Sequence, residues 1–286
     1  MPKFDAHEYL NVDTYEEGLQ AFHAVSGAVL FEFAREPRAD RDLIIRNFIA
    51  RTNTMARGVF ALYRLGDYQD CWILFRCLLD RLFHLHAIAT RNEFEVFEAW
   101  SFLEQYNAQN RVRSNPEFRG AVESEMFAIK PEDKERARHL SANPPQWRRP
   151  FVEDVAKSLN MAFLYRFGYD YASTHVHPMA NDGWQDFYTI TKLEPPSDFP
   201  DQRSALVNTL LVATMVVQVG LNASSLYWMA LLYNCLDDLR QFIGTGSLEY
   251  RARLATLATV SQQGSRLSSA TPGSPTQKPA DDGGRT

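Results

Sequence analysis

Apolar residues recur every three to four positions through most of the chain, the spacing that places them on one face of an α-helix. The first half of the pattern predicts helices over residues 14–37, 39–66, 68–92 and 93–112. Their ends carry residues that stop or start helices. Gly66 follows an apolar run as a terminating glycine does, and Asp67 can cap the next helix. The pattern therefore predicts an all-α fold.

The second half is interrupted more often. Prolines break residues 114–150, a helix is expected over 152–177, and the loop that follows contains one short extended stretch at 186–192. A long uncharged helix then runs from about 202 to 242, and a weaker one follows Gly246. We expect a single multi-helix bundle with a long central apolar helix.

The last residues differ in composition from the rest. From Gly264 onward the chain is rich in Ser, Pro, Gly and Asp and almost free of large apolar side chains. The expected organisation is one all-helical domain over residues 1–262 and a disordered tail over 263–286.

One segment is apolar enough to raise the question of a membrane span. Residues 204–236 carry no charge, and 206–234 is long enough to cross a bilayer. Polar residues nevertheless fall on one arc of this helix, as expected for the central helix of a soluble bundle: Ser204, Asn208, Gln218, Asn222 and Ser225. No membrane span is expected.

Composition narrows the class of protein. The chain has 286 residues, of which 45% are hydrophobic and 23% charged, and its net charge is −5. This balance argues against binding to nucleic acid through bulk charge, although a local basic site remains compatible with it. Three cysteines in apolar contexts indicate a reducing compartment, and no signal peptide precedes the first helix, so a cytoplasmic location is expected.

A first group of candidate functional residues lies on the helix over 68–92. Arg76, Asp80 and His84 project within about 80° of one another on an otherwise apolar helix. Desolvation should drive Arg76 and Asp80 to pair. The pair is either a structural contact that orients helices or the wall of a site. In the second case Arg76 binds an anion, Asp80 orients it or acts as base, and His84 transfers protons.

A second group lies on the helix over 152–177. Arg166, Asp170, Ser173 and His177 project within about 60° of one another. His177 precedes Pro178 at the helix end, where the helix dipole favours its protonated form. Ser173 can hydrogen-bond either that imidazole or a backbone carbonyl. The alternative interpretation is that His177 only terminates the helix.

Metal and cofactor signatures are missing from the sequence. His175 and His177 face opposite sides of a helix, and no HExxH or Glu-x-x-His motif accompanies them. A Gly-rich phosphate loop and a G-x-S-x-G elbow are also missing. We therefore predict neither a metal site nor a cofactor.

These motifs resemble those of a family of uncharacterised bacterial helical domains, over about residues 40–240. That family carries Arg-x-x-x-Glu after a short Gly turn, which Arg76 and Asp80 match with Asp in place of Glu. Its second motif, Tyr…Ser-x-x-x-His-Pro, is matched by Tyr169, Ser173 and His177. The resemblance implies a helical fold and no established activity. Asp80 is one methylene shorter than the Glu of the family's motif.

A weaker resemblance is to the HEPN superfamily, whose Arg-x(4–6)-His motif fits Arg81 to His86. It implies a metal-independent ribonuclease, in which Arg76 or Arg166 stabilises the transition state and His177 acts as general acid or base on a 2′-hydroxyl. Sites of such enzymes often lie at a dimer interface, so a homodimer is expected.

Two functional hypotheses follow. In the first, Arg76, Asp80, Ser173 and His177 are catalytic and RNA is the substrate. In the second, the protein is a non-catalytic regulatory module that binds a small anionic ligand or a partner. In both, the site is lined by a further set of polar residues: His84, Arg166, Tyr169, Asp170, Asn208, Gln218 and Asn222. A purely structural role for the Arg76–Asp80 and Ser173–His177 contacts is the remaining alternative.

Overall fold

The computed structural model describes residues 12–35, 39–118, 129–177, 179–180, 183–194, 203–226, 230–257 and 259. Every regular element within these residues is helical, which confirms the predicted all-α fold. The predicted tail over 263–286 lies outside the described residues, and the division into one domain and a tail stays a prediction.

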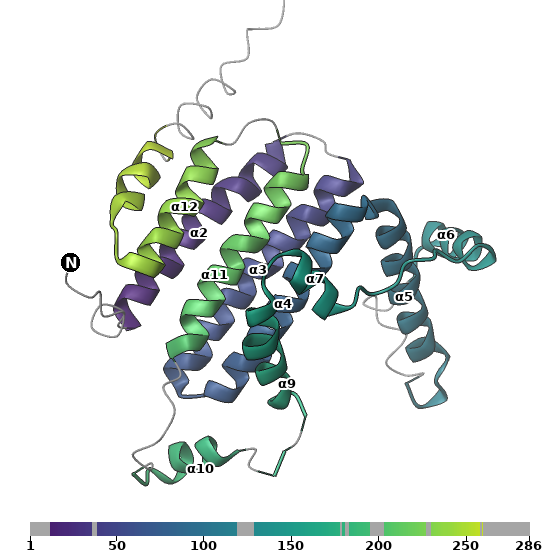
Figure 1. Cartoon of the computed structure of the whole chain (residues 1–286). Helices are drawn as coiled ribbons and strands as arrows, with labels where there is room; N and C mark the ends of the chain where they lie inside the picture. Colours follow the sequence, from purple (N-terminus) through teal and green to yellow (C-terminus); the bar gives the residue numbers. More distant parts are fainter. Residues whose placement is uncertain are drawn as a thin grey trace, which may run out of the picture.

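Five helices form the main bundle (Figure 1). They are listed in chain order: α2 (Val12–Arg35), α3 (Asp40–Leu65), α4 (Tyr68–Arg91), α11 (Arg203–Ala223) and α12 (Ala230–Thr245). The helix α11 contacts the other four. It approaches α3 so closely at Gly220 that an added Cβ would lie 2.9 Å from Ile45. The predicted central apolar helix is therefore α11.

Local sequence determines several helix ends. Gly66 adopts the left-handed conformation (φ 85°) and its amide and that of Asp67 donate to carbonyls in the last turn of α3. Asn92 ends α4 in the same way, with φ 54°. Asp67 occupies the predicted N-cap position, but its side chain makes no capping hydrogen bond.

An arm extends from the bundle. The helix α5 (Phe94–Ser114) packs on α3 and α4, continues past them, and carries α6 (Pro131–Ala142) on its side (Figure 1). Trp147 follows α6 and is buried, with its ring centroid 4.9 Å from Phe97 and 4.5 Å from Trp100. This aromatic cluster attaches the returning chain to α5.

The single helix predicted over 152–177 is wrong. The structure divides it into α7 (Val152–Ser158), α8 (Ala162–Leu164), a π-helical segment η3 (Tyr165–Asp170) and α9 (Tyr171–Thr174). The break falls at Asn160, whose φ is 57°, a left-handed conformation that a helix interior does not contain. The last helical residue is Thr174, so His177 lies beyond the helix.

Two further predictions need correction. Residues 186–191 belong to the helix α10 (Trp184–Thr191) and Lys192 follows its end; Thr189 lies beside Gly66, so tertiary packing overrides the local preference for an extended strand. The helix expected over 202–242 is two helices, α11 and α12. Near the end of α11, the amide and hydroxyl of Ser225 both donate to the buried carboxylate of Asp42. The weaker helix after Gly246 is present over 249–257.

Within the described residues, one helix, α11, has the length and the apolar composition needed to cross a membrane. Of its most apolar window, 61% is buried inside the bundle. This burial is typical of a core helix.

Candidate functional site

Arg76 is the centre of a polar cluster between α4 and the η3–α9 segment. Its Nε donates to Ser173 Oγ at 3.0 Å, and its two terminal nitrogens donate to Asp80 Oδ2 at 2.5 Å and to Tyr169 Oη at 2.6 Å. The Arg76 and Asp80 side chains are 24% and 28% exposed. All three guanidinium nitrogens thus have partners within the protein.

The π-helical segment positions this cluster. A π turn spaces residues more widely around the helix axis than an α turn and is frequent at functional sites. Here it brings Gly168 against Phe75 of α4, where an added Cβ would lie 3.4 Å from the Phe75 ring. The next residue, Tyr169, stacks on Tyr165 and lies beneath the guanidinium, 4.4 Å from ring centroid to Arg76 Cζ. Burial, followed by the Asp80 charge, raises the Tyr169 pKa and keeps the phenol protonated.

His84 lies one turn beyond Asp80, and its Nδ1 is 2.7 Å from the Asp80 backbone oxygen. Since a carbonyl only accepts hydrogen bonds, Nδ1 carries the proton. The ring lies 6.0 Å from that of Trp147, and burial lowers the His84 pKa, which favours the neutral imidazole. His84 therefore lies beside the cluster, next to Asp80, and is a neutral side chain that donates a hydrogen bond to its own helix.

The residues predicted to converge with Arg76 from the second helix divide into two sets. Ser173 and Tyr169 reach it, whereas Arg166, Asp170 and His177 are exposed. The hydroxyl of Ser173 donates to the Tyr169 carbonyl at 2.7 Å, so it makes the backbone contact rather than the imidazole contact. The projection failed for the other residues because it assumed a regular α-helix through the π turn and beyond Thr174.

The predicted polar stripe on α11 contacts a different part of the fold. Gln218 donates to Asn222 at 3.3 Å and accepts from Arg240 of α12 at 3.3 Å, and Asn222 accepts from Tyr233 Oη at 2.9 Å. Asn208 is half-buried on the same helix and makes no hydrogen bond to the Arg76 cluster. Gln218 and Asn222 link α11 to α12 instead.

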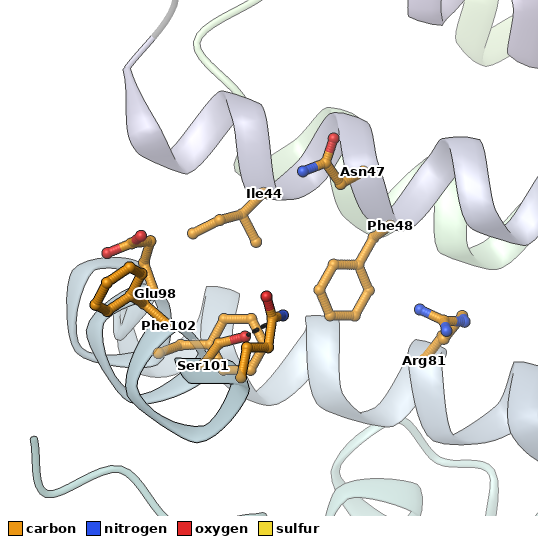
Figure 2. A pocket seen from close by; sticks show the side chains of 9 residues that line it. Ile44, Asn47, Phe48, Arg81, Glu98, Ser101 and Phe102 are labelled. Carbon is orange, nitrogen blue, oxygen red and sulfur yellow. Dashed lines mark hydrogen bonds between the residues drawn. The ribbon is translucent and has the colours of Figure 1, made fainter. Parts of the chain in front are cut away.

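A pocket that the sequence did not indicate lies where α3, α4 and α5 meet. Its volume is about 340 Å³. Figure 2 shows Asn47 and Phe48 reaching into it from α3, Arg81 from α4, and Ser101 and Phe102 from α5. The full lining is Ile44, Asn47, Phe48, Arg81, Phe97, Glu98, Ser101, Phe102 and Gln105.

Arg81 supplies the positive charge of this pocket. Its Nε donates to the thioether sulfur of Met55 at 2.9 Å, and thioethers are weak acceptors. The adjacent acid, Asp80, is bound to Arg76, and no carboxylate of the described residues forms an ion pair with Arg81. Burial, followed by the charge of Arg51 one turn beyond Asn47, lowers the Arg81 pKa. The pocket therefore holds a desolvated cation without an anionic partner among the described residues.

The far side of the pocket is closed by an ion pair. Arg136 of α6 pairs with Glu98, and its guanidinium carbon lies 4.2 Å from the centroid of the Phe102 ring. In the view of Figure 2, Glu98 and Arg81 lie on opposite sides of the Phe48 ring. The pocket thus carries a positive charge on the side of Arg81, whereas on the opposite side Arg136 neutralises the charge of Glu98.

The comparison with family models identifies the chain. A model described as a family of unknown function (DUF5677) matches residues 42–189, which is 148 of 286 residues. The protein belongs to this family. No curated protein and no solved structure matches the chain.

The matched DUF5677 region contains both sites. It runs from the first turn of α3 into α10, and so includes the Arg76 cluster and every residue that lines the pocket. The predicted membership in an uncharacterised helical family is confirmed, while the likeness to the HEPN superfamily stays a prediction.

The Arg-x(4–6)-His pair of this DUF5677 member diverges in space. Arg81 lines the pocket between α3, α4 and α5. The Nε2 atom of His86 lies 3.4 Å from Ser158 Oγ of α7 and 3.5 Å from Thr90 Oγ1. The two side chains therefore serve different interfaces of α4.

No three His, Cys, Asp or Glu side chains among the described residues gather closely enough to hold a metal ion. Each guanidinium nitrogen of Arg76 has a partner within the protein, whereas Arg81 in the pocket has only the Met55 sulfur as an acceptor among the described residues.

Proposed function

We propose that the protein is a non-catalytic binding module whose pocket between α3, α4 and α5 takes a small anionic ligand. The observation that carries the proposal is that Arg81 has no anionic partner among the described residues. A guanidinium has five N–H donors and binds carboxylates and phosphates through two parallel hydrogen bonds. That of Arg81 lines an open pocket and has only a thioether sulfur as a hydrogen-bond acceptor among the described residues.

The remaining walls indicate the body of the ligand. Three phenylalanines (Phe48, Phe97 and Phe102) supply apolar and aromatic surface, and Asn47 and Gln105 supply amide donors and acceptors. A volume of about 340 Å³ falls at the lower end of the range for small-molecule sites, roughly 300–1,000 Å³. The ligand that fits is a compact planar or aromatic molecule with a carboxylate or phosphate at one end.

The ribonuclease hypothesis is less well supported by the same geometry. Stabilising a phosphorane-like transition state needs an arginine that is available to the substrate, and each of the three guanidinium nitrogens of Arg76 already donates to Ser173, Asp80 or Tyr169. His177, the expected general acid or base, is exposed and makes no hydrogen bond to Ser173. Both features favour a binding module over an RNA-cleaving enzyme.

The test compares a planar anion with a neutral analogue. Phenyl phosphate, benzoate and the neutral analogue benzamide are each titrated into the full chain. The midpoint temperature of thermal unfolding is measured in each case. A ligand at ten times its dissociation constant stabilises by about 1.4 kcal/mol. We expect the anions to raise the midpoint of the wild type and of Arg91→Met, a control whose half-exposed arginine lies on the same helix outside the pocket. In Arg81→Met the shift should disappear.

Three results contradict the proposal. The first is a thermal shift of equal size in Arg81→Met, and the second is no shift with either anion in the wild type. The third is cleavage of RNA by the wild type that is lost in His177→Ala, which would favour the ribonuclease.

A further inference from the structure

The amide of Asn47 turns its donors towards the pocket between α3, α4 and α5. Its Oδ1 atom accepts from Nε and Nη2 of Arg46, at 3.3 and 3.2 Å. Because a guanidinium only donates, these contacts fix the orientation of the amide and leave Nδ2 without an acceptor among the described residues. The wall of α3 therefore adds two N–H donors to those of Arg81.

The guanidinium of Arg81 is held by its inner nitrogen alone. Nε donates to Met55 Sδ at 2.9 Å, and neither terminal nitrogen has an acceptor within the part of the chain that the structure describes. The two terminal nitrogens of a guanidinium lie side by side and can bind two oxygens of one anion. The Met55 contact thus orients Arg81 and leaves this end of the side chain for a ligand.

Acceptors are scarce on the remaining walls. The carboxylate of Glu98 already pairs with Arg136. Gln105 Nε2 donates to Ser101 Oγ at 3.4 Å, the contact drawn as a dashed line in Figure 2. That contact uses Ser101 as an acceptor, so its hydroxyl hydrogen is a further donor without an acceptor among the described residues.

Donors therefore line the pocket from three helices. In the view of Figure 2, Asn47 of α3 lies above the Phe48 ring, Ser101 of α5 to its left and Arg81 of α4 to its right. A carboxylate offers two oxygens in one plane, whereas the phosphoryl group of a phosphate ester offers three strong acceptor oxygens. Donors that approach from three sides suit the phosphoryl group better.

A second positive charge lies at the α3 edge of the pocket. Arg51 follows Asn47 by four residues and precedes Met55 by four, so these three side chains share one face of α3. Arg51 is exposed and has no ion pair or hydrogen bond with any described residue. Its charge contributes to the lowered pKa of Arg81, so the two guanidinium groups repel each other. A dianion offsets this repulsion more strongly than a monoanion does.

We propose that the ligand of this pocket is a phosphomonoester, with Arg81 and Asn47 donating to its dianionic phosphoryl group and Arg51 covering that group from the α3 edge. Ser101 donates to the third oxygen, and the organic part of the ester lies against the phenylalanine rings of the other walls. The proposal rests on the function proposed above, an anion-binding pocket, and names the class of anion.

The test compares three anions that share one phenyl group. Phenyl phosphate is a dianion above about pH 6, phenyl sulfate is a tetrahedral monoanion, and benzoate is a planar one. Isothermal titration calorimetry on the full chain at about pH 7.5 should show phenyl phosphate binding at least about 10-fold tighter than the other two. This advantage over phenyl sulfate, which does not titrate in this range, should shrink towards about pH 5 as the phosphoryl group is protonated.

A substitution of the outer arginine tests the role of the second charge. Arg51→Met should weaken phenyl phosphate about 5-fold and the monoanions about 2-fold, because the electrostatic energy scales with the charge of the ligand. Arg57→Met is the matched control, since this exposed arginine of α3 acts on His23 of α2. It should leave all three dissociation constants unchanged, and the circular dichroism of both variants should match that of the wild type.

The outcomes separate this proposal from the one on which it rests. Equal affinities for the three anions, all lost in Arg81→Met, would overturn the phosphomonoester and leave the anion-binding pocket standing. Phenyl sulfate binding as tightly as phenyl phosphate would overturn the preference for a dianion. Phenyl phosphate affinity that is the same in Arg51→Met as in Arg57→Met would overturn the role of Arg51. Binding of none of the three anions by the wild type would remove both proposals.

Discussion

The same substitution should change stability by very different amounts at two arginines five residues apart on α4. Arg76→Met and Arg81→Met both remove a guanidinium while keeping an unbranched apolar side chain with high helix propensity. Arg76 donates three hydrogen bonds, one of them to a carboxylate. Arg81 donates one, to a thioether sulfur.

The expected magnitudes follow from these contacts. Hydrogen bonds to charged groups contribute about 1.5–3 kcal/mol each. Because the Arg76 and Asp80 side chains are each about a quarter exposed, solvent screening reduces the total, and Arg76→Met should cost about 2–4 kcal/mol. Arg81→Met should change stability by less than about 1 kcal/mol, since it removes a desolvated charge together with a weak contact.

The assay is urea unfolding followed by far-UV circular dichroism, at one protein concentration and without ligand, because association and binding both shift apparent stability. In thermal unfolding the Arg76→Met difference corresponds to a fall of roughly 5–15 °C. Equal losses for the two variants would refute the reasoning. A loss below about 1 kcal/mol for Arg76→Met would do the same.

Two more predictions test the packing and the protonation of the core. Gly220→Ala should cost about 1–3 kcal/mol, because the new Cβ meets Ile45 at 2.9 Å and Ile49 at 3.0 Å, whereas Gly27→Ala in α2 meets nothing within 4 Å and should gain about 0.5–1 kcal/mol in thermal unfolding. Burial lowers the His84 pKa, so the unfolded chain binds more protons near its ordinary pKa; stability should fall as the pH drops from 7.5 to 5.5, and His84→Gln should flatten that dependence. An unchanged slope in His84→Gln, or a Gly220→Ala variant as stable as Gly27→Ala, would contradict these expectations.

The sequence best predicts those features that depend on residues close together in the chain. The boundary between α3 and α4 follows from Gly66, and the Arg76–Asp80 pair follows from i, i+4 spacing on one helix. Tyr169 and Ser173 were named as candidates from their motif, and the structure brings both to Arg76.

The features that were missed depend on deviations from regular geometry or on tertiary contacts. The π turn over Tyr165–Asp170 and the end of α9 at Thr174 move residues away from an ideal helical projection, so Arg166, Asp170 and His177 were not brought to Arg76 as expected. The pocket combines side chains of α3, α4 and α5, and the residue that supplies its positive charge, Arg81, was noted only for a different motif.

The position of α11 in the chain also bears on how the protein is made. The helices α2, α3 and α4 all pack against α11, yet α11 ends at Ala223, far beyond the end of α4 at Arg91. Translation of residues 92–223 at about 5–20 residues per second takes roughly 7–26 s. During this interval Ile45 and Ile49 lack the surface that covers them in the finished protein. The face of α3 that carries Ile45 and Ile49 therefore stays uncovered on the nascent chain until α11 has emerged and docked.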